Sequence, residues 1–171
     1  MTIVRELEQL PALLAKLNLD SSKKIISIDG FFGAAKSKVS AYLTEALSIP
    51  TVYLDDFLPR DRASLESFKF KDFSETVAKL SQSYSVIVDG SMVQDILARI
   101  GVTADFFIYV KRVSPYGIWF DDFKIDKLVR SSNDHSTVKY NHFEEEVIQY
   151  HLRVRPHERA HIIVELVEGI A

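Results

Sequence analysis

A strand, a glycine turn and a helix follow one another near the start of this sequence, and this order limits the fold more than any other feature. The run "KKIISID" is short, apolar and rich in β-branched residues, and Gly30 closes it. This pattern predicts a strand buried inside a sheet. From Val39 to Leu47, apolar residues recur at helical spacing, and Pro50 requires the helix to have ended. The segment therefore predicts a β-turn-α unit.

The same alternation continues along the chain. Further strands are expected at "TVYLDDF", "YSVIVDG", "ADFFIYV" and "HIIVELV", with short helices between them at 73–80 and 93–100. Strands that alternate with helices predict an α/β, three-layer fold, with a mostly parallel five-stranded sheet and helices on both faces. At 171 residues and 47% hydrophobic residues, the chain is expected to form one domain over residues 1–171.

The first 20 residues have an amphipathic pattern of their own. Leucines and one isoleucine recur at spacings of three and four, which predicts a leader helix over residues 1–20 that Pro11 kinks or restarts. Its apolar stripe suits packing on its own domain or on a second chain equally well. A homodimer therefore stays open.

Charge and composition narrow the class of partner. The 24 acidic residues nearly balance the 21 basic ones, giving a net charge of -3, so we expect neither nucleic acid nor a membrane as the main partner, but a small molecule. The absence of cysteine excludes disulfides, thiolate metal sites and a cysteine nucleophile. With no signal-peptide pattern and no apolar run of about 20 residues, we expect a cytoplasmic protein.

The glycine turn nearly matches a phosphate-binding loop, or P-loop. The usual pattern is G-x-x-x-x-G-K-[ST], and the chain reads "GFFGAAKS", with Ala35 at the last glycine position. Backbone N–H groups of such a loop hold phosphate oxygens at the helix N-terminus, the lysine adds a positive charge, and the hydroxyl binds Mg²⁺. ATP and Mg²⁺ are therefore the expected cofactors, and the candidate nucleotide-binding residues are Gly30, Phe31, Gly33, Ala34, Ala35, Lys36, Ser37 and Lys38.

Carboxylates follow three of the predicted strands. Asp29 ends the first, Asp55 and Asp56 end the second, and Asp89 ends the third, where "VIVDG" matches the Walker B pattern of an apolar strand before an acid. In parallel sheets, ligands bind beyond the carboxyl ends of the strands. The sequence therefore places its candidate chemistry at one edge of the sheet.

Taken in order, these segments resemble the uridine kinase and phosphoribulokinase group of P-loop kinases, particularly the bacterial uridine kinase-like proteins. The resemblance rests on the leader, "IDGFFGAAKS", "YLDDFLPR", "VIVDG" and the closing "QYHLRVRPHERAHIIVEL", and it covers residues 3 to 167. It implies an ATP- and Mg²⁺-dependent kinase that acts on a hydroxyl of a small metabolite, with a nucleoside such as uridine as the nearest precedent.

The resemblance also implies roles for single residues. Ser37 and Asp89 would be the metal partners, and Asp55 would act beside Lys36 as the catalytic base that accepts a proton from the acceptor hydroxyl, with Asp56 as the alternative base. Phe57 would line the acceptor pocket. Arg60 or Arg62 would bind an anionic part of the substrate.

The chain departs from the family pattern at the loop and at the lid. Ala35 adds a Cβ that costs about 1–2 kcal/mol if its backbone is left-handed. Across the lid-like region, about 112–141, the expected arginine-rich stretch is replaced by "WFDDF", and Lys111, Arg112, Lys127 or Arg130 could substitute for the arginines. Asp121, Asp122 and the run "EEE" at 144–146 are expected to be solvated.

These departures leave two alternatives to a kinase. One is a degenerate, non-catalytic nucleotide-binding or protein-interaction module on a kinase fold. The other is a different P-loop enzyme, such as a nucleotide-monophosphate kinase or a hydrolase. Turnover with and without an acceptor separates the three.

Overall fold

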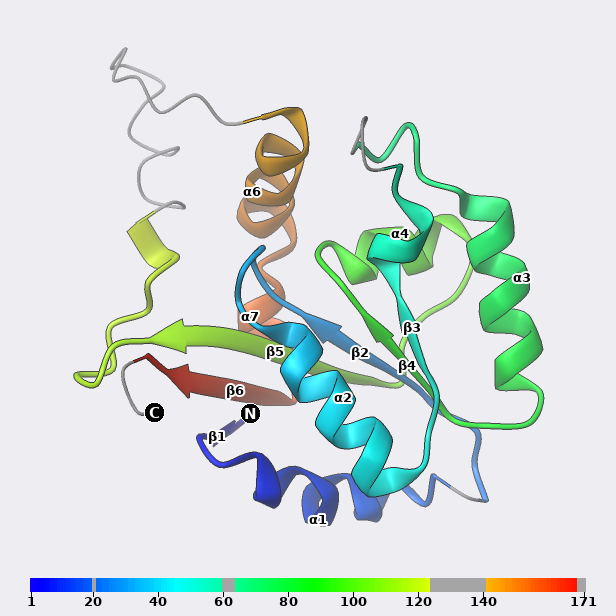
Figure 1. Ribbon diagram of the computed structural model, residues 1–171, viewed down its shortest axis with the longest axis horizontal. Coiled ribbons are helices and arrows are strands. Elements are labelled where there is room, and N and C mark those ends of the chain that lie inside the picture. Colours follow the sequence, from blue (N-terminus) through cyan, green and yellow to red (C-terminus); the bar gives the residue numbers. More distant parts are fainter. Residues whose placement is uncertain (20, 60–63, 124–140, 169–171) are drawn as a thin grey trace.

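The structure is a computed structural model that describes residues 1–19, 21–59, 64–123 and 141–168. It contains a six-stranded sheet in the order β1-β6-β5-β2-β4-β3, in which every neighbouring pair is parallel (Figure 1). The strands are β1 (Thr2–Val4), β2 (Ile25–Asp29), β3 (Thr51–Tyr53), β4 (Val86–Asp89), β5 (Phe106–Val113) and β6 (Ile162–Val167).

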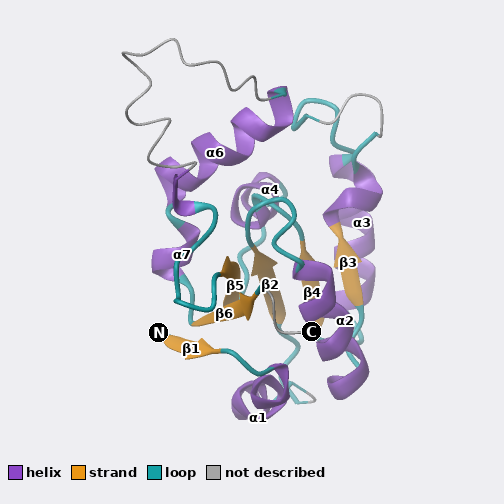
Figure 2. Ribbon diagram, turned by 60° about the vertical axis from the view of Figure 1, so that its left-hand side comes forward, coloured by secondary structure: helices purple, strands orange, loops and turns teal. Residues whose placement is uncertain are grey.

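Helices lie on both faces of this sheet (Figure 2). The helices are α1 (Leu10–Leu14), α2 (Lys36–Leu47), α3 (Phe70–Ser81), α4 (Val93–Arg99), α6 (His142–Val154) and α7 (Pro156–Arg159). α1 and α2 contribute Leu14 and Leu43 to the core on one face, while α3 and α6 contribute Phe73 and Val147 to the core on the other. The predicted α/β three-layer fold is confirmed, with six strands where five were expected.

The additional strand comes from the N-terminal segment, where a helix was predicted. Residues 2–4 form β1 and pair with residues 162–164 of β6, so the prediction of a leader helix over residues 1–20 is wrong at its start. Helical structure begins with the 3₁₀ turn η1 (Leu7–Gln9) and continues through α1 into η2 (Ala15–Leu17), with Pro11 in the first turn of α1. Thr2, Ile3 and Val4 are β-branched, and the open edge of β6 gives them a pairing partner.

The remaining predicted strands and helices are present, with one boundary that matters for the site. The strand expected over "TVYLDDF" ends at Tyr53, and the next four residues form the 3₁₀ turn η3 (Leu54–Phe57). The two acidic residues of that segment therefore sit on a turn at the carboxyl edge of the sheet. Within the described residues, the helices are too short and too polar to cross a bilayer.

Candidate functional site

The loop from β2 to α2 is shaped by two glycines. A Cβ at Gly30 would lie 2.7 Å from the carbonyl oxygen of Val110 on β5, which real side chains do not tolerate, so glycine is required where β2 leaves the sheet. Gly33 has a φ of 74°, a left-handed conformation that glycine adopts without strain. The loop then closes through the Ala34 N–H, which donates to the Phe31 carbonyl at 3.1 Å.

Ala35 carries the strain that its sequence position suggested. Its φ of 59° and ψ of 34° are left-handed, so the methyl group costs about 1–2 kcal/mol relative to glycine. The residue is the N-cap of α2, and no side chain of the described chain caps this helix end. The first N–H groups of α2, together with the positive end of its dipole, are therefore available to an anion.

A cleft of about 260 Å³ opens in front of this helix end. It is bounded by the loop, β3, η3 and the end of β4, and for brevity we name it the loop cleft. Six predicted site residues, which lie up to 56 positions apart in the sequence, meet there: Gly33, Ala35, Lys36, Ser37, Asp55 and Asp89. The cleft is lined by Gly33, Ala35, Lys36, Ser37, Tyr53, Asp55, Asp89 and Gly90.

Lys36 is folded back onto the loop. Its Nζ donates to the carbonyl oxygens of Phe31 at 2.8 Å and Gly30 at 3.2 Å, and to Ser91 Oγ at 3.2 Å. Burial lowers the pKa of the ammonium group, and the carboxylates of Asp29, Asp89 and Asp55 oppose that change. The lysine is thus half-buried, with carboxylates around it.

Asp89 is fixed by a residue that the sequence reasoning missed. Ser40, on the first turns of α2, donates to Asp89 Oδ2 at 2.6 Å, and both residues are buried. Burial raises the pKa of Asp89, whereas the Ser40 hydrogen bond and Lys36 favour its ionised form. Ser40 stands one helical turn after Lys36 and beside Val39, so a polar residue on the buried face of α2 was the available signal.

Asp29 lies at the same sheet edge but is sealed from the cleft. Its exposed fraction is 2%, Oδ1 accepts from the Gly30 N–H at 2.7 Å, and Oδ2 accepts from the Tyr150 hydroxyl on α6. Burial raises the pKa of Asp29 to about 6, although the hydrogen bonds and Lys36 act against the rise. Asp29 therefore lies at the expected edge of the sheet but does not line the cleft.

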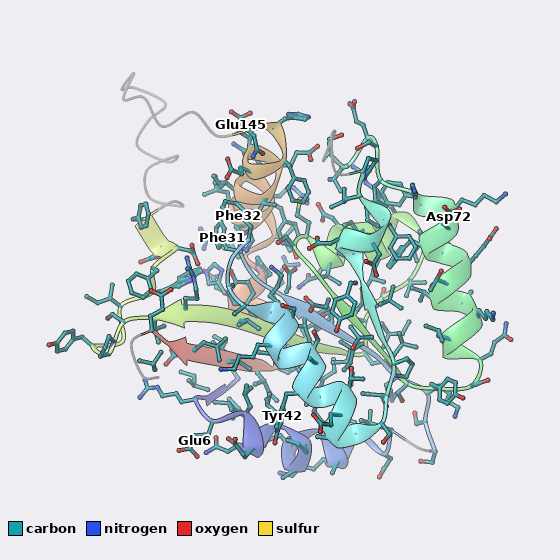
Figure 3. The ribbon with its side chains drawn as sticks, in the orientation of Figure 1. Glu6, Phe31, Phe32, Tyr42, Asp72 and Glu145 are labelled. Atoms are coloured by element: carbon teal, nitrogen blue, oxygen red, sulfur yellow. The ribbon has the colours of Figure 1, made fainter. Side chains whose placement is uncertain are left out.

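Aromatic side chains hold the loop against α6. The ring of Phe31 is fully buried and stacks on His151 with ring centroids 3.8 Å apart, and Trp119 lies 6.1 Å from it. Figure 3 places Phe31 and Phe32 beside α6. The side chain of Phe31 thus belongs to the core, and only its backbone faces the lysine. Of the other predicted loop residues, Ala34 is buried and Lys38 is exposed.

One side of the cleft is formed by η3. Asp55 is exposed and lines the cleft, whereas Asp56 is exposed on the same turn without lining it. The Phe57 ring packs edge-on against Phe73 at 5.3 Å and lies 6.1 Å from Phe68, so it is held in the core cluster. Its place in an acceptor pocket stays a prediction.

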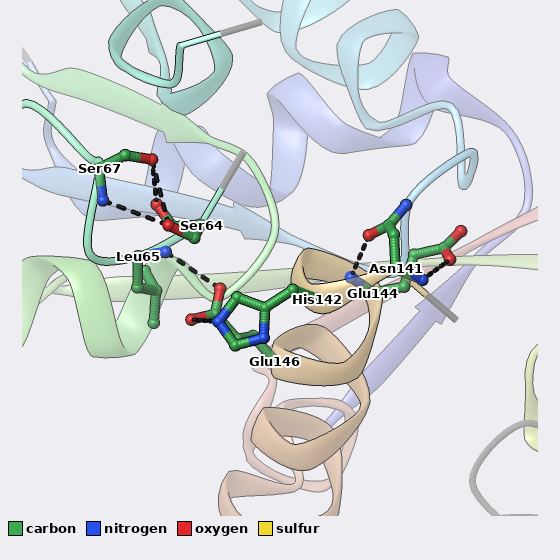
Figure 4. A network of polar contacts seen from close by, with 7 residues as sticks. All are labelled: Ser64, Leu65, Ser67, Asn141, His142, Glu144 and Glu146. Atoms are coloured by element: carbon green, nitrogen blue, oxygen red, sulfur yellow. Dashed lines mark hydrogen bonds and ion pairs between the residues drawn. The ribbon is translucent and has the colours of Figure 1, made fainter. Parts of the chain in front are cut away.

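The segment after η3 is attached to α6 (Figure 4). The Leu65 N–H donates to Glu146 Oε2 at 3.0 Å, and Asn141 and Glu144 form a capping box at the start of α6. The prediction that residues 144–146 form only a solvated face is therefore wrong for Glu144 and Glu146. Both carboxylates satisfy backbone N–H groups that would otherwise lack partners.

The lid-like region is described only up to residue 123. Asp121 is 1% exposed and lies 3.8 Å from Arg112, which corrects the expectation that it is solvated. Lys111 lies over the Trp119 ring at 4.4 Å from its centroid, so this lysine is occupied by a cation–π contact. The candidate residues Arg60, Arg62, Lys127 and Arg130 lie outside the described residues.

A divalent ion would find few protein ligands in the loop cleft. The described residues contain no group of three or more His, Cys, Asp or Glu side chains arranged to hold a metal. Ser37 and Asp89 nevertheless both line the cleft, and oxygen ligands of this kind suit Mg²⁺, which keeps several waters and binds through one or two carboxylates plus substrate phosphates. The site fits a metal that arrives with a nucleotide better than a resident one.

Comparisons with known proteins agree with the fold. No protein-family model matches the chain, and no curated protein matches it. A possible uridine kinase from Bacillus stearothermophilus superimposes with a TM-score of 0.57, covering 92% of this chain and 97% of that chain at 11% identity. A sugar kinase from Janibacter sp. gives a TM-score of 0.50, covering 85% of this chain and 86% of that chain at 13% identity. The chain therefore has the fold of P-loop kinases, which confirms the resemblance at the level of fold.

Proposed function

We propose that this protein is an ATP- and Mg²⁺-dependent kinase that transfers a phosphoryl group to a hydroxyl of a small metabolite. The observation that carries the proposal is the meeting of an uncapped helix N-terminus, a half-buried lysine and two carboxylates in one cleft. The kinase fold of the structural neighbours supports it, and a nucleoside such as uridine is the acceptor we put first.

The helix end and Lys36 would hold the nucleotide. The N–H groups at the start of α2 would bind phosphate oxygens, and the lysine, now satisfied by two loop carbonyls and Ser91, would turn its charge to the phosphates. The neighbouring carboxylates favour the charged form of this ammonium group and oppose the effect of burial on its pKa. Ser37 and Asp89 would hold Mg²⁺, which supplies charge neutralisation at the phosphates when bound.

Asp55 would act as the base for the acceptor hydroxyl. It lies on η3 across the cleft from the loop, where its carboxylate could orient an acceptor hydroxyl and take up its proton. Asp56, on the same turn but not lining the cleft, is the weaker choice. The mechanism asks little covalent chemistry of the protein, since phosphoryl transfer depends mainly on positioning and electrostatic stabilisation.

The test separates binding from transfer. A calorimetric titration with ATP and Mg²⁺ should give saturable binding that Lys36→Ala abolishes, with Lys79→Ala, an exposed lysine on α3 outside the cleft, as the matched control. A panel of nucleosides and sugars should then yield acceptor-dependent ADP. Unchanged ATP affinity in Lys36→Ala would refute the phosphate site.

The left-handed conformation of Ala35 favours a second candidate function, which the same experiment tests. The left-handed Ala35 places strain and a methyl group in the cleft wall, and small misplacements of a reacting phosphate lower rates greatly. A non-catalytic nucleotide-binding or protein-interaction module would bind ATP through Lys36 yet give no product with any acceptor. ADP formation without an acceptor would instead indicate a hydrolase.

A further inference from the structure

Two successive residues of α6 hold the start of the phosphate loop. The Tyr150 hydroxyl donates to the carboxyl group of Asp29, and the ring of His151 stacks on Phe31 with an interplanar angle of 18°. Tyr150 is 1% exposed, and His151 and Phe31 are fully buried. α6 therefore contacts both Asp29, the last residue of β2, and Phe31, the second residue of the loop. It lies more than 110 residues further along the chain.

Asp29 connects the Tyr150 hydroxyl to the loop backbone by hydrogen bonds. One carboxylate oxygen accepts from Tyr150, and the other accepts from the Gly30 N–H at 2.7 Å. Because the carboxyl group is 2% exposed, water cannot readily replace the Tyr150 hydroxyl, and the loss of one of the hydrogen bonds to this carboxylate is costly. The hydroxyl of Tyr150 thus restrains the first peptide group of the loop through a single intervening side chain.

Lys36 is oriented by the same two loop residues. Its Nζ donates to the carbonyl oxygens of Gly30 and Phe31, at 3.2 and 2.8 Å. Gly30 is held through Asp29, and Phe31 is held through its stacked ring. Both carbonyls that set the direction of the lysine therefore belong to residues that α6 fixes.

We propose that Tyr150 is a positioning residue for the phosphate-binding loop, acting through Asp29 and Gly30 on Lys36. It lines no part of the loop cleft, so it influences a ligand only through the loop. The nucleotide-binding part of this role rests on the proposed function. The restraint on the Gly30 backbone does not.

The test uses a double-mutant cycle in the full chain. Tyr150→Phe removes the hydroxyl and keeps the ring, and it should weaken binding of MgATP about tenfold, the loss expected for one hydrogen bond to a charged group. Asp29→Asn should also weaken binding, and in its presence Tyr150→Phe should add less than about twofold, because both changes break the same connection. Tyr109→Phe is the matched control: its ring is equally buried, its hydroxyl has no hydrogen-bond partner among the described residues, and MgATP affinity should stay unchanged.

A second readout needs no ligand. Amide exchange at Gly30, measured by NMR, should be faster in Tyr150→Phe and in Asp29→Asn than in the wild type, and unaltered in Tyr109→Phe. If wild type fails to bind MgATP, the proposed function falls and the Gly30 exchange rates alone decide the role of Tyr150. Should Tyr150→Phe not fold, the exchange rate of Asp29→Asn decides it. A Tyr150→Phe protein that melts earlier but keeps wild-type Gly30 exchange would overturn the proposal, since the tyrosine would then be structural only.

Discussion

Replacing Ala35 with glycine should stabilise this protein, which is unusual for a substitution that deletes a methyl group. Ala35 has a φ of 59°, and its methyl group is exposed, so little packing is lost when it is removed. Relief of the left-handed strain contributes about 1–2 kcal/mol. The added freedom of glycine in the unfolded chain removes about 0.4–1 kcal/mol of this gain.

The net gain in the free energy of unfolding is about 0.8 kcal/mol, the difference between the midpoints of these two contributions. For a domain of this size, that corresponds to a rise of roughly 1–4 °C in melting temperature. Urea denaturation followed by circular dichroism gives the free energy, and scanning calorimetry gives the melting temperature. ATP affinity should change little, because backbone N–H groups, which glycine retains, hold phosphates at a helix end.

Ala34→Gly is the matched control one residue earlier. Ala34 is fully buried and is not among the residues with positive φ, so glycine there loses a packed methyl group and gains backbone freedom. It should destabilise the protein by about 1–2 kcal/mol. If Ala35→Gly destabilises the protein as Ala34→Gly does, the strain assigned to Ala35 is not present in solution and the reasoning is refuted.

Three further predictions follow from the site. Asp55→Asn should lower turnover by about 10²–10⁴-fold, the usual contribution of a general base, while leaving ATP affinity nearly intact; steady-state kinetics with the best acceptor would contradict this if kcat were unchanged. Gly90→Ala should destabilise the protein by about 1–3 kcal/mol in urea, because its Cβ would lie 2.6 Å from Leu54, and a wild-type midpoint would show that Leu54 moves freely. The folded-state pKa of Asp29 is raised to about 6 from 3.8, so the folded state binds more protons than the unfolded state between these values, and rising pH removes stability there. Relative to Asp29→Asn, wild type should lose about 2 kcal/mol between pH 4 and 6, and a difference that is constant with pH would contradict the buried position of the carboxyl group.

Most of the fold could be predicted from the sequence because its central strands are largely buried. A strand covered on both faces is mostly apolar, so β2, β4, β5 and β6 stand out as short, largely apolar runs between helical segments. The edge strand β1 cannot be recognised in this way, because it is only three residues long and two of them are exposed. Ile3 fits a helical spacing together with Leu7 and Leu10, and residues 2–4 form a strand because they pair with the edge of β6.

The candidate site could be predicted in part for a similar reason. Lys36, Ser37, Asp55 and Asp89 follow strands or a glycine turn, and parallel strands bring their carboxyl ends to one edge. Which way each side chain turns there could not be predicted. Asp29 and Asp89 both end buried strands, yet one is sealed by a tyrosine from a distant helix while the other lines the cleft.

The sequence by itself determined the order of the central strands and helices, the phosphate-loop motif and the position, Ala35, at which a left-handed backbone would be strained. These features depend on local periodicity and on residues within a few positions of one another. The tertiary structure alone decided that Ser40 fixes Asp89, that Tyr150 fixes Asp29, and that Asp121 is buried. Each of these depends on contacts between segments 49 or more residues apart or on burial by the whole domain. No local pattern encodes those distances, since they arise only when the helices close over the sheet.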